Sequence, residues 1–138
     1  MSKRSGDCVN TDSHRVSRTL QQGDVVLINF GNRCEGSRSL YGKRPGYVIS
    51  RHSDDKGAGV IMVVPLFRNK SRDSIGNDVE IRPVDCRGLR YTEYAQVMNM
   101  QKIRKHQVIR RIGRVNNETI HTELLSSMWE QVEREDGR

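Results

Sequence analysis

Arg44 is the residue whose position most suggests chemistry, because it stands directly before Pro45 at the start of a short apolar run. Proline lacks the N–H that a β-ladder needs, so it occurs at the first residue or the edge of a strand. The residue before a proline is restricted to an extended backbone. The sequence therefore predicts that Arg44 is held at the rim of a sheet, where its cation can serve a ligand. A structural salt bridge at that rim is the alternative interpretation.

The charge of the chain also points to an anionic partner. The net charge is +7, and residues 99–114 carry six basic side chains and no acidic one, whereas residues 115–138 carry two basic and six acidic ones. A concentrated basic field attracts polyanions, nucleic acid above all, although a solvated charged surface has the same composition. Aromatic residues make up only 5% of the chain, which argues against an extensive base-stacking platform.

Metal and cofactor chemistry is not indicated. The three cysteines and four histidines are scattered without metal-ligand spacing: Cys8, Cys34, Cys86, His14, His52, His106 and His121. We expect three free thiols in a reducing cytoplasm. Apolar runs fall short of the roughly 20 residues of a membrane span, and the N-terminal residues do not form a secretory signal.

The elements that must position Arg44 fit one domain of 138 residues. Residues 1–21 lack an apolar period and are predicted to form a flexible arm. Residues 22–133 are expected to form the folded domain, and residues 134–138 a frayed tail. Apolar runs predict strands at residues 25–30, 46–50, 60–66, 79–81 and 94–100, and residues 106–112 are predicted to form a helical turn or a short helix.

A C-terminal helix is predicted by a capping residue and by a stripe of apolar residues at helical spacing. Asn116 or Asn117 can cap it, and Glu118 suits the positive end of its dipole. Apolar residues then recur at helical spacing: Ile120, Leu124, Leu125, Met128, Trp129 and Val132. Trp129 is expected in the core or in a dimer interface rather than in a ligand platform. Several short strands followed by one helix predict a small antiparallel barrel, mainly β with a C-terminal helix packed on it.

These elements carry a specific set of motifs in order. Gly23-Asp24 opens the first strand, a Gly-Ser loop follows, and Arg44-Pro45 leads into Val48-Ile49-Ser50. Val63-Val64-Pro65-Leu66 and a late Ile112-Gly113 before the final helix complete the order. Over residues 22–132 this pattern resembles the MazF/PemK toxins of type II toxin–antitoxin systems.

The resemblance implies an Src-homology-3-like barrel of the MazF/CcdB type that forms a homodimer. It also implies sequence-selective cleavage of single-stranded mRNA without metal or cofactor, through attack of the ribose 2′-hydroxyl on the adjacent phosphate. The expected partners are single-stranded RNA and a cognate antitoxin, whose C-terminal peptide occupies the RNA groove. No membrane is expected among the partners.

The resemblance also implies site residues. Arg44 matches the catalytic arginine of the family, and its guanidinium suits a phosphoryl group. Gly36 and Ser37 match the loop that borders the RNA groove. Arg38 and Lys43 flank that loop, either as phosphate contacts or as solvated charges.

One position departs from the family pattern. Phe67 stands where many members have a catalytic threonine, and a phenyl ring cannot donate or accept a proton. The ring could stack on a base or pack against neighbours. Arg68 and Asn69 follow it and are candidates to replace the lost donor in the RNA site.

Three functions therefore remain open. The first is an endoribonuclease toxin. The second is a catalytically weakened barrel that binds RNA or a protein without cutting, which Phe67 motivates. The third is a topoisomerase poison. It ranks last because such action resides in a C-terminal tail with a Trp near its end, whereas here Trp129 lies on the apolar stripe of the predicted helix and the tail is acidic.

Overall fold

The computed structural model of the chain describes residues 20–31, 40–50, 59–70 and 78–136. Within these ranges lie the strands β1 (Asp24–Asn29), β2 (Lys43–Val48), β3 (Val60–Phe67), β4 (Asp78–Ile81), β5 (Glu93–Gln96), β6 (Gln101–Arg104) and β7 (Val108–Arg114). Helix α2 (Glu118–Asp136) follows, and the short 3-10 helices η1 (Val97–Asn99) and η2 (Lys105–Gln107) flank β6. The prediction of a mainly β chain with a C-terminal helix is confirmed.

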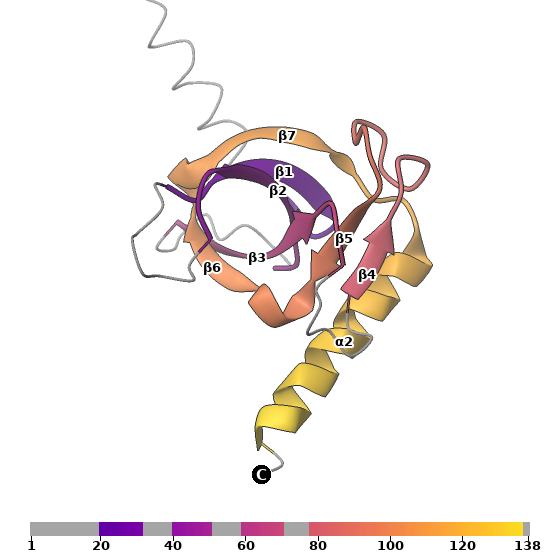
Figure 1. The fold of residues 1–138 in the computed structure, drawn as a ribbon. Coiled ribbons are helices and arrows are strands. Elements are labelled where there is room, and N and C mark those ends of the chain that lie inside the picture. The colour runs from indigo at the N-terminus through magenta and orange to yellow at the C-terminus, as the bar shows by residue number, and fades with distance from the viewer. Residues whose placement is uncertain (1–19, 32–39, 51–58, 71–77, 137–138) are drawn as a thin grey trace, which may run out of the picture.

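The strands pair antiparallel in the order β4-β5-β3-β2-β1-β7, and β6 pairs with β3 beside this path. One edge of β3 is shared, since residues Val60–Val63 pair with β6 and Leu66 and Phe67 pair with β5. Figure 1 shows that the sheet curls into a barrel, with β4 and β5 set to one side next to α2. The end of β3 therefore lies where the barrel meets the β4–β5 hairpin.

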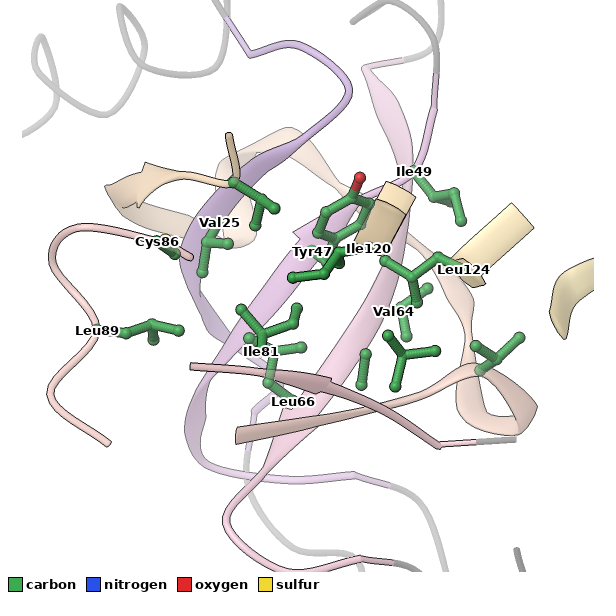
Figure 2. Packing of buried hydrophobic residues seen from close by; sticks show 14 residues of the cluster. Val25, Tyr47, Ile49, Val64, Leu66, Ile81, Cys86, Leu89, Ile120 and Leu124 are labelled. Carbon is green, nitrogen blue, oxygen red and sulfur yellow. The ribbon is translucent and has the colours of Figure 1, made fainter. Parts of the chain in front are cut away.

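The central strands read as continuous apolar runs because both faces of the sheet are buried. Alternate residues of β1, β2 and β3 enter two separate cores. Val25, Tyr47, Val64 and Leu66 belong to the core under α2 and the β4–β5 hairpin, and Figure 2 shows them in one cluster with Ile120 and Leu124 of the helix. The second core contains Val26, Ile28, Val48, Ile61, Val63, Ile103 and Val108.

Helix α2 begins as the sequence predicted. The backbone N–H of Thr119 donates to Oδ1 of Asn117 at 2.9 Å, so Asn117 caps the first turn. Deeper in the core, the hydroxyl of Tyr47 and Nδ1 of His121 lie 2.5 Å apart and join the helix to β2. Burial raises the pKa of Tyr47 to about 12, so the hydroxyl stays protonated at neutral pH.

Trp129 does not lie in the core, because 63% of its surface is exposed. The first turns of α2 bury Ile120 and Leu124, and Leu125 and Met128 pack partly against the same core. The second half of the helix then extends beyond the β4–β5 hairpin (Figure 1). The apolar residues do lie on a helix as predicted, but the barrel is too short to cover the whole apolar stripe of that helix.

The predicted helical turn at residues 106–112 is wrong. Only Lys105–Gln107 form a 3-10 helix, and residues 108–114 form β7, which pairs with β1. The register of this pairing shifts between Val25 and Val26 and again between Leu27 and Ile28. Such irregularities interrupt the period of two, which explains why no alternation marks β7 in the sequence.

The predicted strand at residues 94–100 is too long. It ends at Gln96, where the chain turns into η1 before β6 begins. Ala95 and Val97 are buried, whereas Met98 is 43% exposed. The turn is needed because β5 pairs with the end of β3, whereas β6 pairs with the beginning of the same strand.

Leu20, which lies in the segment predicted to form the flexible arm, is buried in the second core.

Among the described residues, no helix is both long and apolar enough to cross a membrane.

Candidate functional site

Arg44 lies inside strand β2, not before it, so the predicted strand start at Gly46 was three residues late. Arg44 pairs with Ile28 of β1, and Pro45 pairs with Leu27. Pairing of β2 with β3 begins only at Gly46. Arg44 therefore lies on a part of β2 that is supported by β1 on one edge and is outside the β3 ladder on the other.

Phe67, the residue at the threonine position, contacts Arg44 directly. The guanidinium carbon of Arg44 lies 4.4 Å from the ring centroid of Phe67. The β2–β3 register explains this contact, because Gly46 pairs with Pro65 and the same register continued by two residues brings Arg44 opposite Phe67. A cation over a phenyl ring is stabilised by about 0.5–1 kcal/mol where it is exposed.

The contact holds the guanidinium without using its hydrogen-bond donors. The ring covers the face of the guanidinium, whereas the N–H bonds point outward in its plane. Nε of Arg44 is buried and has no acceptor among the described residues. A buried donor without a partner costs about 1–3 kcal/mol. Within the described part of the chain, Nε of Arg44 thus lacks a hydrogen bond, and an anionic oxygen that reached it would supply that bond.

Two more cations at this end of the molecule lie over aromatic rings. The guanidinium carbon of Arg68 lies 3.6 Å from the ring centroid of Tyr91, and Nζ of Lys70 lies 5.8 Å from that of Tyr94. Tyr94 pairs with Phe67 across β5 and β3. The sequence analysis named Arg68 but neither tyrosine. The β3–β5 register places Tyr94 beside Phe67, and Tyr91 lies just before β5 begins at Glu93.

Glu93 is the buried carboxyl of this region, with 7% of the residue exposed. Burial raises the pKa of Glu93, and the charges of Arg68 and Arg44 oppose this rise. The desolvation of the Glu93 carboxyl therefore outweighs the effect of the two positive charges on its pKa.

The other predicted site residues are only partly brought together. Lys43 is exposed and, as the neighbour of Arg44 in a strand, it points to the opposite face of the sheet. Asn69 is exposed beside Arg68. Gly36, Ser37 and Arg38 lie outside the described residues.

The basic stretch at residues 99–114 is partly neutralised by a buried acid. Asp24 is fully buried and accepts a hydrogen bond from Arg114 at 3.1 Å. Arg111 also contacts its carboxylate at 3.6 Å. These two arginines therefore have a carboxylate partner, and the count of six unopposed charges overstated the free basic surface.

The described residues contain no group of three His, Cys, Asp or Glu side chains that could hold a metal ion. Cys86 is a free, buried thiol whose pKa burial raises to about 11, so it is protonated and unreactive at neutral pH. Cys8 and Cys34 lie outside the described residues.

The family is established by the sequence. Residues 21–124 match the model of the family described as "PemK-like, MazF-like toxin of type II toxin-antitoxin system". The match covers most of the chain, and this protein belongs to that family of toxins. A comparison with curated proteins gives no match.

Solved structures share the fold. A mycobacterial endoribonuclease in complex with its cognate antitoxin is 17% identical, with a TM-score of 0.61 over 83% of this chain and 93% of that one. The Mycobacterium tuberculosis toxin MazF-mt6 is 15% identical, with a TM-score of 0.62 over 80% and 96%. MazF from Deinococcus radiodurans is 13% identical, with a TM-score of 0.65 over 83% and 96%. At these identities the likeness defines the barrel and not the chemistry.

Proposed function

We propose that this protein is a sequence-selective endoribonuclease that cleaves single-stranded mRNA in the cytoplasm without a metal ion. The observation that carries the proposal is the guanidinium of Arg44, held over Phe67 with a buried and unpaired Nε–H. Membership of the toxin family supports this proposal, and so does the likeness of the fold to that of the mycobacterial endoribonuclease.

In the proposed reaction the 2′-oxygen of a ribose attacks the adjacent phosphorus. The bond from phosphorus to the 5′-oxygen of the next nucleotide breaks, which leaves a cyclic phosphate and a 5′-hydroxyl end. The proton of the 2′-hydroxyl is lost and the leaving oxygen gains one. Arg44 would donate hydrogen bonds to the phosphoryl oxygens as charge accumulates on them, which stabilises the transition state more than the ground state.

The toxin would act as a homodimer and be neutralised by an antitoxin. Relatives of this fold have been solved as complexes with a cognate antitoxin or with MazE. The exposed Trp129 on the extended half of α2 offers apolar surface for a second copy. An antitoxin with an acidic, extended C-terminal peptide would compete with RNA for Arg44 and Arg68. A molecular mass of one chain by light scattering at micromolar concentration would contradict the dimer.

The activity is tested with purified protein and a labelled single-stranded RNA in EDTA. We expect defined fragments with cyclic-phosphate and 5′-hydroxyl ends. Once the cleavage site is mapped, a 2′-deoxy substitution at the attacking ribose should abolish the cut. RNA that remains intact after long incubation, or fragments with 5′-phosphate ends, would contradict the proposal.

Phe67 favours a second candidate function, a barrel that binds RNA without cutting it. Replacing Phe67 by Thr separates the two. If the ring positions Arg44 for cleavage, the Phe67→Thr protein should cut more slowly than the parent. If the ring has replaced an essential threonine, the parent should bind RNA intact and the Phe67→Thr protein should begin to cut.

A further inference from the structure

The loop between β4 and β5 carries two exposed arginines that the proposed active site does not use. Arg87 and Arg90 are both exposed, and residues 86–92 of this loop include no acidic side chain. Among the described residues, neither arginine forms an ion pair or a side-chain hydrogen bond. Arg82, which precedes them, instead contacts Asp85 at 3.4 Å. The 86–92 loop therefore presents two positive charges that no described carboxylate neutralises.

The backbone of the 86–92 loop is held against the sheet. Leu89 is buried in the core under α2, which anchors the middle of the loop. A Cβ atom on Gly113 of β7 would collide with the backbone oxygen of Arg87, and a Cβ atom on Gly88 would collide with the backbone of β7. Gly88 also has a φ of 110°, which glycine adopts without strain. Because the loop is fixed before a ligand binds, binding does not pay the entropy of ordering it.

The loop also continues a row of cations that begins at Arg44. The guanidinium of Arg44 lies over Phe67, and that of the next residue, Arg68, lies over Tyr91. Tyr91 is 52% exposed and directly follows Arg90 in the chain. Positive charges therefore follow one another from the end of β3 to the 86–92 loop, and along the loop to its contact with β7.

A single-stranded RNA fits this row better than an acidic protein does. Each nucleotide adds a negative phosphate to a flexible chain, so successive phosphates can reach separate cations. Guanidinium planes and exposed aromatic rings also suit unpaired bases. A protein partner would need an apolar anchor at the centre of its contact, but Leu89, the one aliphatic side chain of the 86–92 loop, is buried.

We infer that the 86–92 loop extends the RNA-binding surface beyond the cleavage site, with Arg87 and Arg90 contacting the phosphates of flanking nucleotides. The inference rests on the proposed function, because it lengthens the RNA surface of the same site. Contacts to phosphate fix the path of the RNA and carry no base preference. Arg44 then acts on the phosphate that is cut, and the loop holds the RNA next to it.

The test uses 2′-O-methylated oligonucleotides of uniform sequence, which cannot be cut because the attacking hydroxyl is blocked. Their lengths of about 5 and about 15 nucleotides bracket the usual footprint of a small domain. Anisotropy across a salt series should show tighter binding and a steeper salt dependence for the longer oligonucleotide. In Arg87→Ala/Arg90→Ala, its plot of log affinity against log salt should be shallower by about 1.4, or about 0.7 for each lost phosphate contact. Binding of the shorter oligonucleotide should change little.

Two matched controls accompany the double variant. Arg82→Ala removes a charge from the start of the same loop, but this charge already faces Asp85, so the salt slope should stay that of the parent. Arg87→Lys/Arg90→Lys keeps both charges and should also keep the slope. Since Arg87 and Arg90 are exposed, the melting temperature of the alanine variant should equal that of the parent.

An unchanged slope in the alanine variant, or equal losses for the two lengths, would overturn the inference. So would a polyglutamate peptide that binds more tightly than the longer oligonucleotide and loses this affinity in the same variant, because the loop would then fit an acidic protein. Failure of the nuclease proposal gives a different result. In that case natural RNA stays intact, whereas the tighter binding of the longer oligonucleotide and its loss in the variant are still observed.

Discussion

Two groups of arginines in this small barrel are held in opposite ways. Arg111 and Arg114 contact the buried carboxylate of Asp24, whereas Arg44 and Arg68 lie over the rings of Phe67 and Tyr91. A carboxylate takes up the donors of a guanidinium, but a ring covers only its face. We infer that the arginines held by Asp24 stabilise the fold, and we propose that the arginines held by rings serve an anionic ligand.

The largest expected difference between the groups is in catalysis. Arg44→Ala should reduce the single-turnover rate of RNA cleavage by about 10²–10³-fold, the usual cost of removing one preorganised transition-state donor. Arg111→Ala removes the same charge from the acid-held group and should leave the rate within about threefold of the parent. Equal losses in both variants would mean that general charge, and not the ring-held donor, determines cleavage.

The second difference concerns stability. Asp24→Asn keeps the size of the buried side chain but removes the charge that Arg111 and Arg114 contact. It also weakens the bond that Gln21 N–H donates to the carboxylate at 2.8 Å. The free energy of unfolding in urea should fall by about 1–3 kcal/mol, with cleavage of the folded protein retained. An unchanged stability together with lost cleavage would place Asp24 in the active site instead.

A smaller effect should separate Arg68 from Arg114 in RNA binding. If Arg68 contacts a phosphate, the Arg68→Ala protein should bind non-cleavable RNA more weakly, and its plot of log affinity against log salt should be shallower by about 0.7. Arg114→Ala should leave that slope unchanged because its charge already faces Asp24. The affinities are measured by anisotropy across a salt series. Equal slopes for the two variants would contradict the division of the arginines into those held by rings and those held by Asp24.

The smallest effect involves the pH dependence set by Glu93. Its pKa is raised in the folded protein, so the folded state binds its proton more tightly than the unfolded chain does. The stability that this bound proton contributes is fully present below the pKa of Glu93 in the unfolded chain. It is lost as the pH rises through the pKa of Glu93 in the folded protein. Glu93→Gln should therefore be slightly more stable than the parent at neutral pH and show a flatter stability profile in mild acid. A variant that is less stable at neutral pH would show that the attraction of Arg44 and Arg68 outweighs desolvation.

Much of this fold follows from local patterns. The runs that form β1, β2 and β3 are apolar throughout because two cores flank the sheet, and α2 carries its own cap at Asn117. Strands β6 and β7 were missed because register shifts and exposed basic residues hide their alternation. Edge strands of this kind are specified by their partners and not by their own residues.

The site was predictable only in part. Arg44 and Arg68 could be named from charge, motif order and the neighbouring proline. The contact of Arg44 with Phe67 depends on the β2–β3 register, and the position of Tyr94 beside Phe67 depends on the β3–β5 register. A phenylalanine in place of a threonine looked like a lost catalytic group, whereas the structure places its ring against the arginine.

The most direct test of the central claim is to observe the Arg44 Nε–H itself. In a ¹⁵N-labelled sample, titration with a non-cleavable 2′-O-methylated RNA should move the Arg44 Nε–H resonance to higher proton frequency and slow its exchange with water, as expected for a new bond to a phosphoryl oxygen. The corresponding resonance of Arg111 should stay in place. Saturation of the protein with RNA while the Arg44 resonance remains unchanged would contradict the account.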